Sequence, residues 1–204
     1  MKQEYSLSEI LANIIFVIYT RLFWKKARLI RKPFYCRGKK YINYGKGLTI
    51  GYSCRFETFQ KNNISHGVIE IGENCRIGDR VHITACESVK IGDNCLFASN
   101  ILITDNQHGI YGGATQSSPI EHPNNRVIDA KKVVIGNNVW LGENVVILPG
   151  TEIGDGCVVG ANSVVNKSIK SGTIAIGSPA IPIKIWSEKE RKWVLIKNEK
   201  KQIK

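Results

Sequence analysis

No apolar stretch in this chain is long enough to cross a lipid bilayer. The longest, residues 10–23, is interrupted by Asn, Thr and Arg, whereas a membrane-spanning helix needs about 20 mostly apolar residues in succession. Glu4 and Glu9 precede it where a secretory signal would be basic, and no small-residue cleavage site follows. The pattern therefore predicts an amphipathic helix within an N-terminal segment of residues 1–46, and neither a transmembrane helix nor a signal peptide.

Basic residues outnumber acidic ones at both ends of the chain and nowhere else. Residues 1–46 hold eleven Lys/Arg against two Asp/Glu, residues 47–184 hold eleven against twelve, and residues 185–204 hold seven against three. The net charge of +12 is thus carried by the two ends. A nucleic-acid-binding domain would carry its positive charge on the folded face, interleaved with aromatic side chains, so we expect no nucleic-acid partner.

The basic flank of the predicted N-terminal helix leaves two interpretations open. The helix can pack on the folded domain or on a neighbouring subunit. It can also lie on an anionic membrane, with nearby cations facing the lipid headgroups. Those cations are Lys25, Lys26, Arg28, Arg31 and Lys32.

The middle of the chain repeats every six residues. An aliphatic or aromatic residue opens each unit, glycine usually follows it, and the fifth residue is usually small or β-branched. Neither a helical period nor strand alternation resets every six residues. The units open at Ile50, Ile71, Ile77, Ile83, Ile91, Phe97 and Ile103, and then at Ile135, Leu141, Ile147, Ile153, Val159 and Val165.

Three such units form one turn of a triangular coil, and stacked turns form a parallel β-solenoid. A regular turn takes eighteen residues, but residues 71–91 take twenty, which predicts a bulge near residues 89–90. Residues 91–135 hold twenty-six residues more than a regular turn. We therefore expect one domain over residues 47–186 with an inserted loop, residues 109–132. Loops of this length in compact domains are usually functional.

The six cysteines do not indicate disulfides. Four of them, Cys54, Cys75, Cys95 and Cys157, hold the fifth position of their units, where a small inward side chain is expected. Cysteines that share a repeat position are typical of the core of a protein in a reducing compartment. We therefore expect a cytoplasmic protein with free thiols.

Residues 50–184 resemble the hexapeptide-repeat acyltransferases. The segment VVIGNNVWLGENVVILPGTEIGDGCVVGANSVV, followed by AIGSPA, is similar to the galactoside and maltose acetyltransferase branch. The segment VHITACESVKIGDNCLFASNILITDNQHG is similar to bacterial polysaccharide and lipopolysaccharide O-acetyltransferases. The resemblance implies an all-β fold, a left-handed parallel β-helix, assembled as a homotrimer. It also implies that acetyl-CoA binds between adjacent subunits and that no metal is required.

His108 closes the last regular unit before the long insertion. Transfer of an acetyl group from a thioester to a sugar hydroxyl needs a general base. An imidazole can accept the proton of the hydroxyl and later protonate the departing thiolate. The resemblance assigns this role to His108. Relatives often have a second histidine two residues earlier, where this chain has Asn106.

The resemblance also implies roles for residues along the edge of the coil. Trp140 would flank the active site, and a backbone N–H at Gly142 or Glu143 would stabilise the oxyanion of the tetrahedral intermediate. The coenzyme is expected to pass five further positions, where lysines would meet its phosphates. Those positions are Gly160, Ala161, Asn166, Lys167 and Lys184.

Other polar residues near His108 in sequence are weaker candidates. His82 holds an outward position of its unit and would line the acceptor groove, with a solvated surface as the alternative. Asp105 or Glu121 would orient the imidazole, and Asp105 is also a candidate acceptor ligand. His122 lies inside the loop, where nothing in the sequence fixes its place.

The last eighteen residues, 187–204, predict a C-terminal helix. Ser187 and Glu190 have the spacing of a capping box. Trp193 and Ile196 would then share one face of the helix and pack on the solenoid end or on a neighbour.

Several functions remain open on this sequence. The favoured one is an acetyl-CoA-dependent O-acetyltransferase for a cell-surface polysaccharide or its lipid-linked precursor, in peripheral contact with the inner face of the cytoplasmic membrane. The alternatives are an acetyltransferase for a small saccharide or antibiotic, and a non-catalytic β-solenoid scaffold. A γ-class carbonic anhydrase has the same solenoid but needs three converging histidines, and the four histidines here include no close pair.

Overall fold

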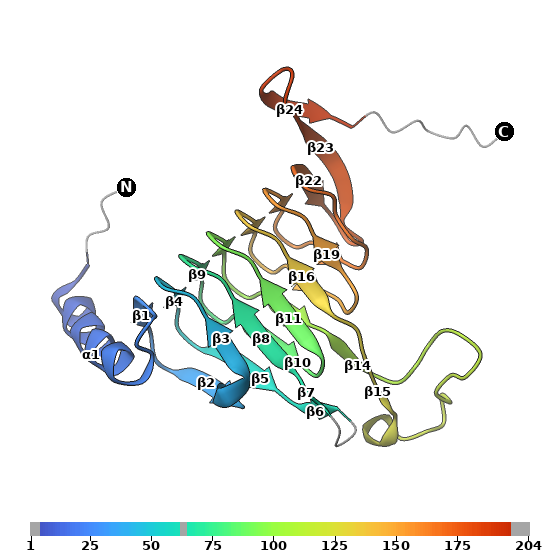
Figure 1. Cartoon of the computed structure of the whole chain (residues 1–204), viewed down its shortest axis with the longest axis horizontal. Coiled ribbons are helices and arrows are strands. Elements are labelled where there is room, and N and C mark those ends of the chain that lie inside the picture. The colour runs from blue at the N-terminus through green and yellow to red at the C-terminus, as the bar shows by residue number, and fades with distance from the viewer. Residues whose placement is uncertain (1–4, 62–64, 197–204) are drawn as a thin grey trace.

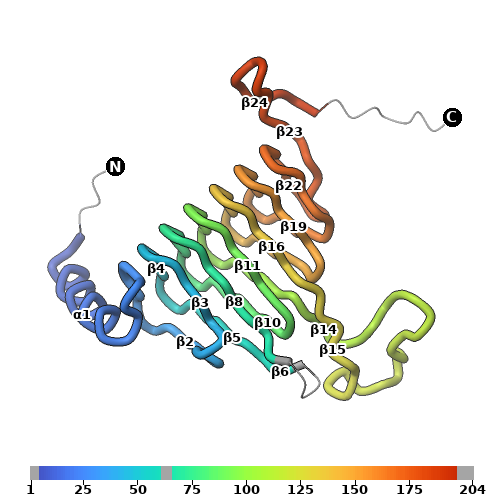
Figure 2. The backbone as a smooth tube through the Cα atoms, in the orientation of Figure 1, coloured from blue at the N-terminus to red at the C-terminus, as the bar shows by residue number. Residues whose placement is uncertain are grey.

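The computed structural model describes residues 5–61 and 65–196. They form a parallel β-helix with a helix at its N-terminal end, a hairpin at its C-terminal end and one long loop leaving its side (Figure 1). The smooth backbone trace shows successive coils stacked along one axis, with the loop projecting away from them (Figure 2).

Three sheets form the faces of the coil, in which strands of successive coils pair in parallel, and the last two strands of the nine-stranded sheet extend it as an antiparallel hairpin. The nine-stranded face contains β1 (Leu29–Ile30), β4 (Thr49–Ile50), β9 (Arg76–Ile77), β12 (Leu96–Phe97), β17 (Trp140–Leu141), β20 (Val158–Val159), β22 (Thr173–Ile176), β23 (Ile181–Ser187) and β24 (Lys192–Leu195). The six-stranded face contains β2 (Phe34–Arg37), β5 (Cys54–Thr58), β10 (His82–Ala85), β13 (Leu102–Thr104), β18 (Val146–Ile147) and β21 (Val164–Val165). The five-stranded face contains β3 (Ile42–Tyr44), β8 (Val68–Ile71), β11 (Ser88–Ile91), β16 (Val133–Ile135) and β19 (Glu152–Ile153).

The first residues of the six-residue units stack into ladders that form the core. Ile50 pairs with Ile77, Ile77 with Phe97, Phe97 with Leu141, and Leu141 with Val159. All five are buried, and each contributes about 1.5–3 kcal/mol by leaving water. The repeat therefore predicted both the architecture and its core.

The corners of the coil explain why glycine and asparagine recur. A Cβ on Gly72 would lie 2.6 Å from the carbonyl carbon of Gly92 in the next coil, so the second position of the unit leaves no room for a side chain. The fourth position is left-handed, with φ of 56° at Asn74 and 57° at Asn138. Asparagine adopts this conformation more readily than most residues.

The repeated cysteines are buried and free, as their shared position predicts. Each thiol donates to a backbone carbonyl of the next coil, as Cys54 Sγ does to Gly78 O at 3.0 Å and Cys75 Sγ to Gly92 O at 3.1 Å. Burial is the main reason that the pKa of Cys54 is raised to about 11. These thiols therefore belong to the core.

Extra residues leave the coil at the corner between the six- and five-stranded faces, which we call the six/five corner. One insertion is the hairpin of β6 (Gln60–Lys61) and β7 (Ser65–His66). The predicted bulge at residues 89–90 is wrong, because both residues pair regularly in β11 and the extra residues occupy the turn before it.

The long insertion also starts at the six/five corner. It opens with β14 (Asn106–His108), which pairs with β15 (Ile128–Ala130) in an antiparallel ladder. Its irregular part is therefore residues 109–127, which include the 3₁₀ helix η2 (Pro123–Asn125).

The predicted C-terminal helix is wrong within the described residues. β23 and β24 form an antiparallel hairpin in which Trp186 pairs with Trp193, their rings meeting edge-on at 5.6 Å. Ser187 Oγ accepts the N–H of Glu190, but this bond closes a turn instead of opening a helix. The aromatic and β-branched residues that follow favour a strand. Residues 197–204 of the prediction lie outside the described part of the chain.

Helix α1 (Leu7–Phe23) begins with the capping box of Ser6 and Glu9. Thr20 fixes it to the coil, because its buried Oγ1 accepts the N–H of Ile30 at 2.8 Å. Trp24 follows the helix and is 2% exposed, with Phe34 against its ring. A second 3₁₀ helix, η1, spans Lys39–Tyr41. Among the described helices, none combines the length and apolar character that a membrane span requires.

Candidate functional site

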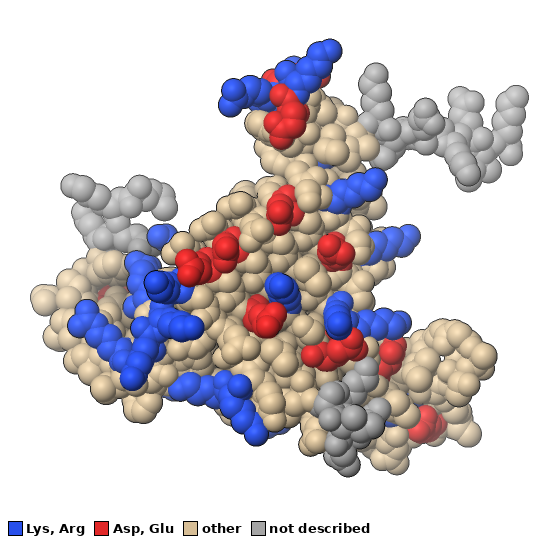
Figure 3. Space-filling view, in the orientation of Figure 1, with Lys and Arg blue, Asp and Glu red and all other residues tan. Residues whose placement is uncertain are grey.

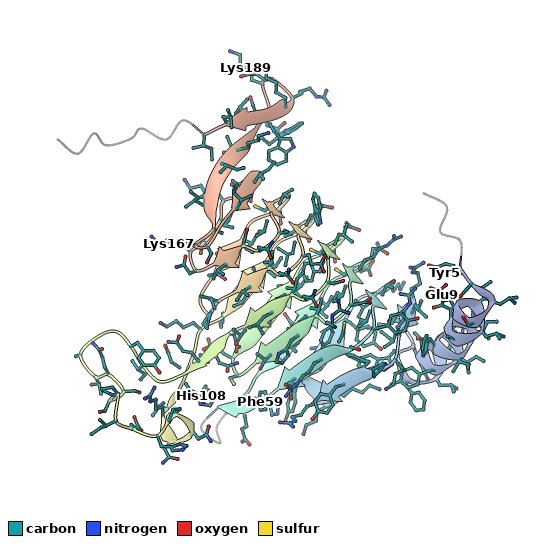
Figure 4. All side chains as sticks on the ribbon, turned by 180° about the vertical axis from the view of Figure 1, so that it is seen from behind. Tyr5, Glu9, Phe59, His108, Lys167 and Lys189 are labelled. Atoms are coloured by element: carbon teal, nitrogen blue, oxygen red, sulfur yellow. The ribbon has the colours of Figure 1, made fainter. Side chains whose placement is uncertain are left out.

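His108 lies at the end of β14, where the long insertion leaves the six/five corner. Its side chain is exposed, and within the described residues its imidazole makes no hydrogen bond. Figure 4 shows it at the root of the loop. The imidazole is therefore free to meet a substrate, as a general base must be.

The loop beyond His108 is held by its own contacts. The Tyr111 hydroxyl donates to His108 O and accepts from Arg126 Nη1 at 2.9 Å. The Arg126 guanidinium also donates to Glu121 O and Pro119 O. One side chain thus joins the start, middle and end of the loop. Arg126 is the only Lys or Arg in residues 109–127, a signal that the sequence analysis missed.

Gly109 is required by the same arrangement. Its φ is +107°, and a Cβ there would lie 2.7 Å from the Tyr111 hydroxyl oxygen. An L-residue would thus be strained by its backbone and would displace the tyrosine. The position of His108 relative to the loop depends on this turn.

Asp105 does not orient His108 and is not available to an acceptor. It is fully buried, and its carboxylate accepts the N–H groups of Cys86, Glu87 and Ser88 at 2.7–2.8 Å. Asn106 Nδ2 donates to it as well. This carboxylate closes the turn between β10 and β11, so its role is structural. Glu121, the other orienting candidate, forms no hydrogen bond or ion pair with His108 within the described residues.

His82 is tied to a buried carboxylate instead of standing free on the surface. Its Nε2 lies 3.1 Å from Glu57 Oε2, and Arg55 and Arg37 form ion pairs with the same glutamate. Burial acts to raise the pKa of Glu57, but the hydrogen bond and charge of Arg55, helped by His82 and Arg37, outweigh it and lower that pKa. The sequence analysis missed Glu57, since nothing local marks it as buried.

The remaining histidines have separate environments. The ring of His66 stacks on Tyr41 with centroids 3.5 Å apart, and His122 Nδ1 accepts the N–H of Asn124. Within residues 5–61 and 65–196, no three His, Cys, Asp or Glu side chains are grouped as metal ligands would be. The convergent histidines of a γ-class carbonic anhydrase are therefore not formed by this part of the chain.

Trp140 and the predicted oxyanion residues lie at another corner, between the nine- and six-stranded faces. We call this the nine/six corner. Trp140 is 51% exposed on β17. The N–H of Gly142 donates to Val159 O at 2.8 Å, so it cannot also serve an oxyanion. Of the two predicted donors, only the N–H of Glu143 remains.

The N–H of Glu143 has no acceptor within the described residues. Earlier at the same corner the equivalent N–H is bound by a side chain one coil on: Tyr52 N donates to Asp79 Oδ1 and Asp79 N to Ser99 Oγ. The residue one coil beyond Glu143 is Ala161, which has no side-chain acceptor. At this corner the pattern stops at Ser99, whose N–H, like that of Glu143, has no acceptor among the described residues, so a free donor remains where one was predicted.

The predicted coenzyme-binding residues divide between the two corners. Gly160 and Ala161 follow β20 at the nine/six corner, and a Cβ on Gly160 would meet Ile176 Cγ2 at 2.7 Å. Asn166 and Lys167 follow β21 at the six/five corner and are exposed. Figure 4 shows Lys167 further along the coil from His108. Lys184 is half-buried in β23, where it pairs with Ile174 and Leu195.

One chain therefore does not bring all the candidate residues together. His108 and Lys167 lie at the six/five corner, whereas Trp140 and Glu143 lie at the nine/six corner, with the six-stranded face between them.

Two family models of hexapeptide-repeat transferases match the coil of this chain. The family description "Bacterial transferase hexapeptide (six repeats)" matches residues 132–167, and "Hexapeptide repeat of succinyl-transferase" matches residues 68–105. The chain belongs to the hexapeptide-repeat acyltransferases, and its fold is their left-handed parallel β-helix.

One curated relative matches nearly the whole chain, and another matches part of it. A protein named as a lipopolysaccharide biosynthesis O-acetyl transferase, WbbJ of Escherichia coli K12, is 41% identical over 194 residues, 95% of this chain and 96% of its own. The galactoside O-acetyltransferase of the same organism is 34% identical over 125 residues, 60% of this chain and 57% of its own. The protein is therefore an acyltransferase of the sugar-modifying kind.

A solved structure shares the fold. The N-acyltransferase AntD of Bacillus cereus, in complex with dTDP and 3-hydroxybutyryl-CoA, superposes with a TM-score of 0.66. The match covers 93% of each chain at 23% identity.

Proposed function

We propose that this protein transfers the acetyl group of acetyl-CoA to a hydroxyl of a sugar, with His108 as the general base. The observation that carries the proposal is the place of His108: an unpaired, exposed imidazole at the root of an ordered loop. The relative named as an O-acetyl transferase, similar over 95% of the chain, supports transfer to oxygen and an acetyl donor.

The proposed reaction needs three groups of this chain. The imidazole of His108 accepts the proton of the sugar hydroxyl, whose oxygen attacks the thioester carbonyl and forms the new C–O bond. The N–H of Glu143 donates to the oxyanion of the tetrahedral intermediate. The C–S bond then breaks, and the imidazolium returns its proton to the departing thiolate. Trp140 would position the reacting ends.

We further propose that the active site forms between copies in a homotrimer. The separation of His108 from Glu143 by a whole face of the coil supports this arrangement. Two coils side by side would also give the coenzyme a groove, with Gly160 and Ala161 on one wall and Asn166, Lys167 and Lys184 near its phosphates. The loop that follows His108 would enclose the acceptor against the neighbouring copy.

The acceptor that fits this proposal best is a cell-surface polysaccharide or its lipid-linked precursor. The relative named for lipopolysaccharide biosynthesis supports it. A small saccharide is the other acceptor of the same chemistry, and the galactoside O-acetyltransferase supports that one.

The direct test is release of free CoA thiol from acetyl-CoA, with lipopolysaccharide O-antigen fragments, galactosides and an amino sugar as separate acceptors. Transfer to oxygen gives an ester that mild alkali cleaves, whereas transfer to nitrogen gives a stable amide. Alkali-labile acetyl on a polysaccharide fragment is the expected result. An amide product, or no thiol release with any acceptor, would contradict the proposal.

A further inference from the structure

Helix α1 presents an aliphatic surface on the side that does not face the coil. Its packed side includes Asn13, Phe16 and Thr20, which contact or approach the first coils. The opposite side is a stripe of large aliphatic side chains, between 45% exposed at Ile10 and 80% at Leu7. The aliphatic stripe consists of Leu7, Ile10, Leu11, Ile14, Ile15, Ile18 and Leu22.

Such a surface needs an explanation, because soluble monomers seldom expose so many contiguous aliphatic side chains. The helix does not need the stripe to hold it in place. Its capping box, the bond from Ile30 to Thr20 and the edge-on contact of Phe16 with Tyr52 all lie elsewhere on it. The stripe is therefore available to a partner.

Positive charge surrounds the same helix. Arg21 lies in its last turn, and Lys25 and Lys26 follow it, all three exposed. Figure 3 shows Lys and Arg gathered at the N-terminal end beside α1, whereas Asp and Glu are spread over the coils. An aliphatic stripe flanked by cations is typical of a helix that lies in the plane of a membrane interface.

A cavity of ≈ 330 Å³ lies between α1 and the nine-stranded face, and three of the residues that line it are Arg28, Arg31 and Arg76. Arg28 Nε donates to Thr49, and the Arg31 guanidinium lies over the Tyr52 ring. Within the described residues, none of the three arginines forms an ion pair with a carboxylate.

The two carboxylates that line this cavity are occupied by backbone groups. Glu9 accepts the N–H of Ser6 at 2.8 Å, and Asp79 accepts the N–H of Tyr52 at 2.7 Å. The cavity therefore offers guanidinium donors, which bind phosphate groups well because they are planar and always charged.

We propose that α1 seats this protein on an anionic membrane, with the aliphatic stripe among the acyl chains and the cavity arginines at the level of the lipid phosphates. An interfacial helix sinks about 5–10 Å into the headgroup and acyl boundary, and a helix is about 10 Å across. The side of α1 that faces the coil, and the arginines beneath it, would then lie in the phosphate layer. The inference does not depend on the reaction proposed above.

Charge favours a membrane over a contact between the α1 segments of two copies. A contact between two α1 segments would bring like-charged segments together, because residues 1–46 hold eleven Lys/Arg and only two Asp/Glu. An anionic leaflet supplies the missing negative charge, and each cation near it strengthens binding by about fivefold.

The test is flotation of the full-length protein with lipid vesicles. Vesicles containing phosphatidylglycerol are compared with pure phosphatidylcholine, at low and at high salt. We expect binding to the anionic vesicles that weakens as salt rises, because salt screens the attraction. Absence of binding to anionic vesicles at low salt would overturn the proposal.

Two pairs of variants separate the two parts of the surface. Ile14→Glu with Ile18→Glu should abolish binding, whereas Leu195→Glu, at the other end of the molecule and 72% exposed, should leave it intact. Arg28→Gln with Arg76→Gln should weaken binding about 25-fold, and Lys170→Gln with Lys189→Gln, far from α1, should weaken it much less. Unchanged binding by the Ile14/Ile18 variant would refute the role of the stripe.

The wild type and the Ile14/Ile18 variant also test whether a second copy of the chain, instead of a membrane, covers the aliphatic stripe. Sedimentation of the wild type and of the Ile14/Ile18 variant reports whether the stripe holds copies together, and circular dichroism shows that both are folded. We expect the same oligomeric state for both. A smaller assembly in the variant would mean that the stripe covers a second copy, and would overturn membrane docking.

Discussion

Ala161 lies one coil beyond Glu143, just as Asp79 lies one coil beyond Tyr52 and accepts its N–H. Because alanine has no acceptor in its side chain, it leaves a backbone donor unpaired at the nine/six corner. A donor of this kind is what the oxyanion of an acyl transfer requires. The proposed catalytic role of the Glu143 N–H thus depends on a residue that only the stacking of coils brings near it.

The first prediction tests that relationship. Ala161→Ser places a hydroxyl one coil beyond Glu143, as Ser99 Oγ is placed to accept the N–H of Asp79, so it should bind the Glu143 N–H and compete with the oxyanion. We expect kcat to fall by about tenfold or more, whereas a rise in the KM for acetyl-CoA would report on the coenzyme groove that Ala161 also lines. Steady-state kinetics measure both constants.

Asp155→Ala is the matched control for that variant. It frees the N–H of Asn137, which lies one coil before Asp155. We expect it to lower the free energy of unfolding by about 1–2 kcal/mol and to leave kcat near the wild-type value. If Ala161→Ser kept full activity, the oxyanion would have another donor.

The second prediction concerns the base. His108→Ala should lower kcat by about a hundredfold or more and leave acetyl-CoA binding nearly unchanged, because the imidazole acts on the hydroxyl and not on the coenzyme. His122→Ala, which removes another histidine of the same loop, should remain active. Equal activity of the His108 variant and the wild type would remove this residue from the mechanism.

The periodic features of the fold could be predicted from the sequence, and the features of single residues could not. A six-residue repeat requires an inward apolar side chain at the same position of every unit. Ile50, Ile77 and Leu141 could therefore be assigned to the core from the sequence, and all three are buried. The C-terminal hairpin occurs once. Its Ser187 and Glu190 carry the spacing of a helix cap, but the pairing of Trp186 with Trp193 decides the outcome.

The candidate site shows the same division. His108 could be identified because the six-residue repeat stops directly after it, and in the structure it lies at the root of the insertion. The role of Asp105, three residues earlier, could not be predicted, because its partners are backbone N–H groups about twenty residues away in sequence. The same holds for the engaged N–H of Gly142, which only the next coil reveals.

The third prediction separates structure from catalysis at Asp105. Asp105→Ala leaves three backbone N–H groups without their acceptor, and should lower the free energy of unfolding by about 3 kcal/mol. Asp105→Asn keeps one acceptor oxygen and should lose less. Urea denaturation measures both values. If either variant instead kept its stability and shifted the pH dependence of kcat, Asp105 would be a positioning residue for His108.

The fourth prediction concerns pH. Burial raises the pKa of Cys54 to about 11, above the value of about 8.5 for an unfolded thiol. Its contribution to stability is therefore fully present below about pH 8.5 and is lost as pH rises through 11. The free energy of unfolding should fall across this window, and Cys54→Val should make the fall shallower. A variant with the same slope as the wild type would contradict the assignment.

The most direct test of a site shared between subunits is complementation between two inactive variants. His108→Ala removes the proposed base from the six/five corner, and Trp140→Ala removes the positioning residue from the nine/six corner. Each pure variant should therefore have little activity. If the site forms between copies, mixed trimers from co-expression contain interfaces with both corners intact, and about a quarter of the wild-type activity should return. If the co-expressed proteins form mixed trimers yet are no more active than the pure variants, the two corners do not belong to one intersubunit site.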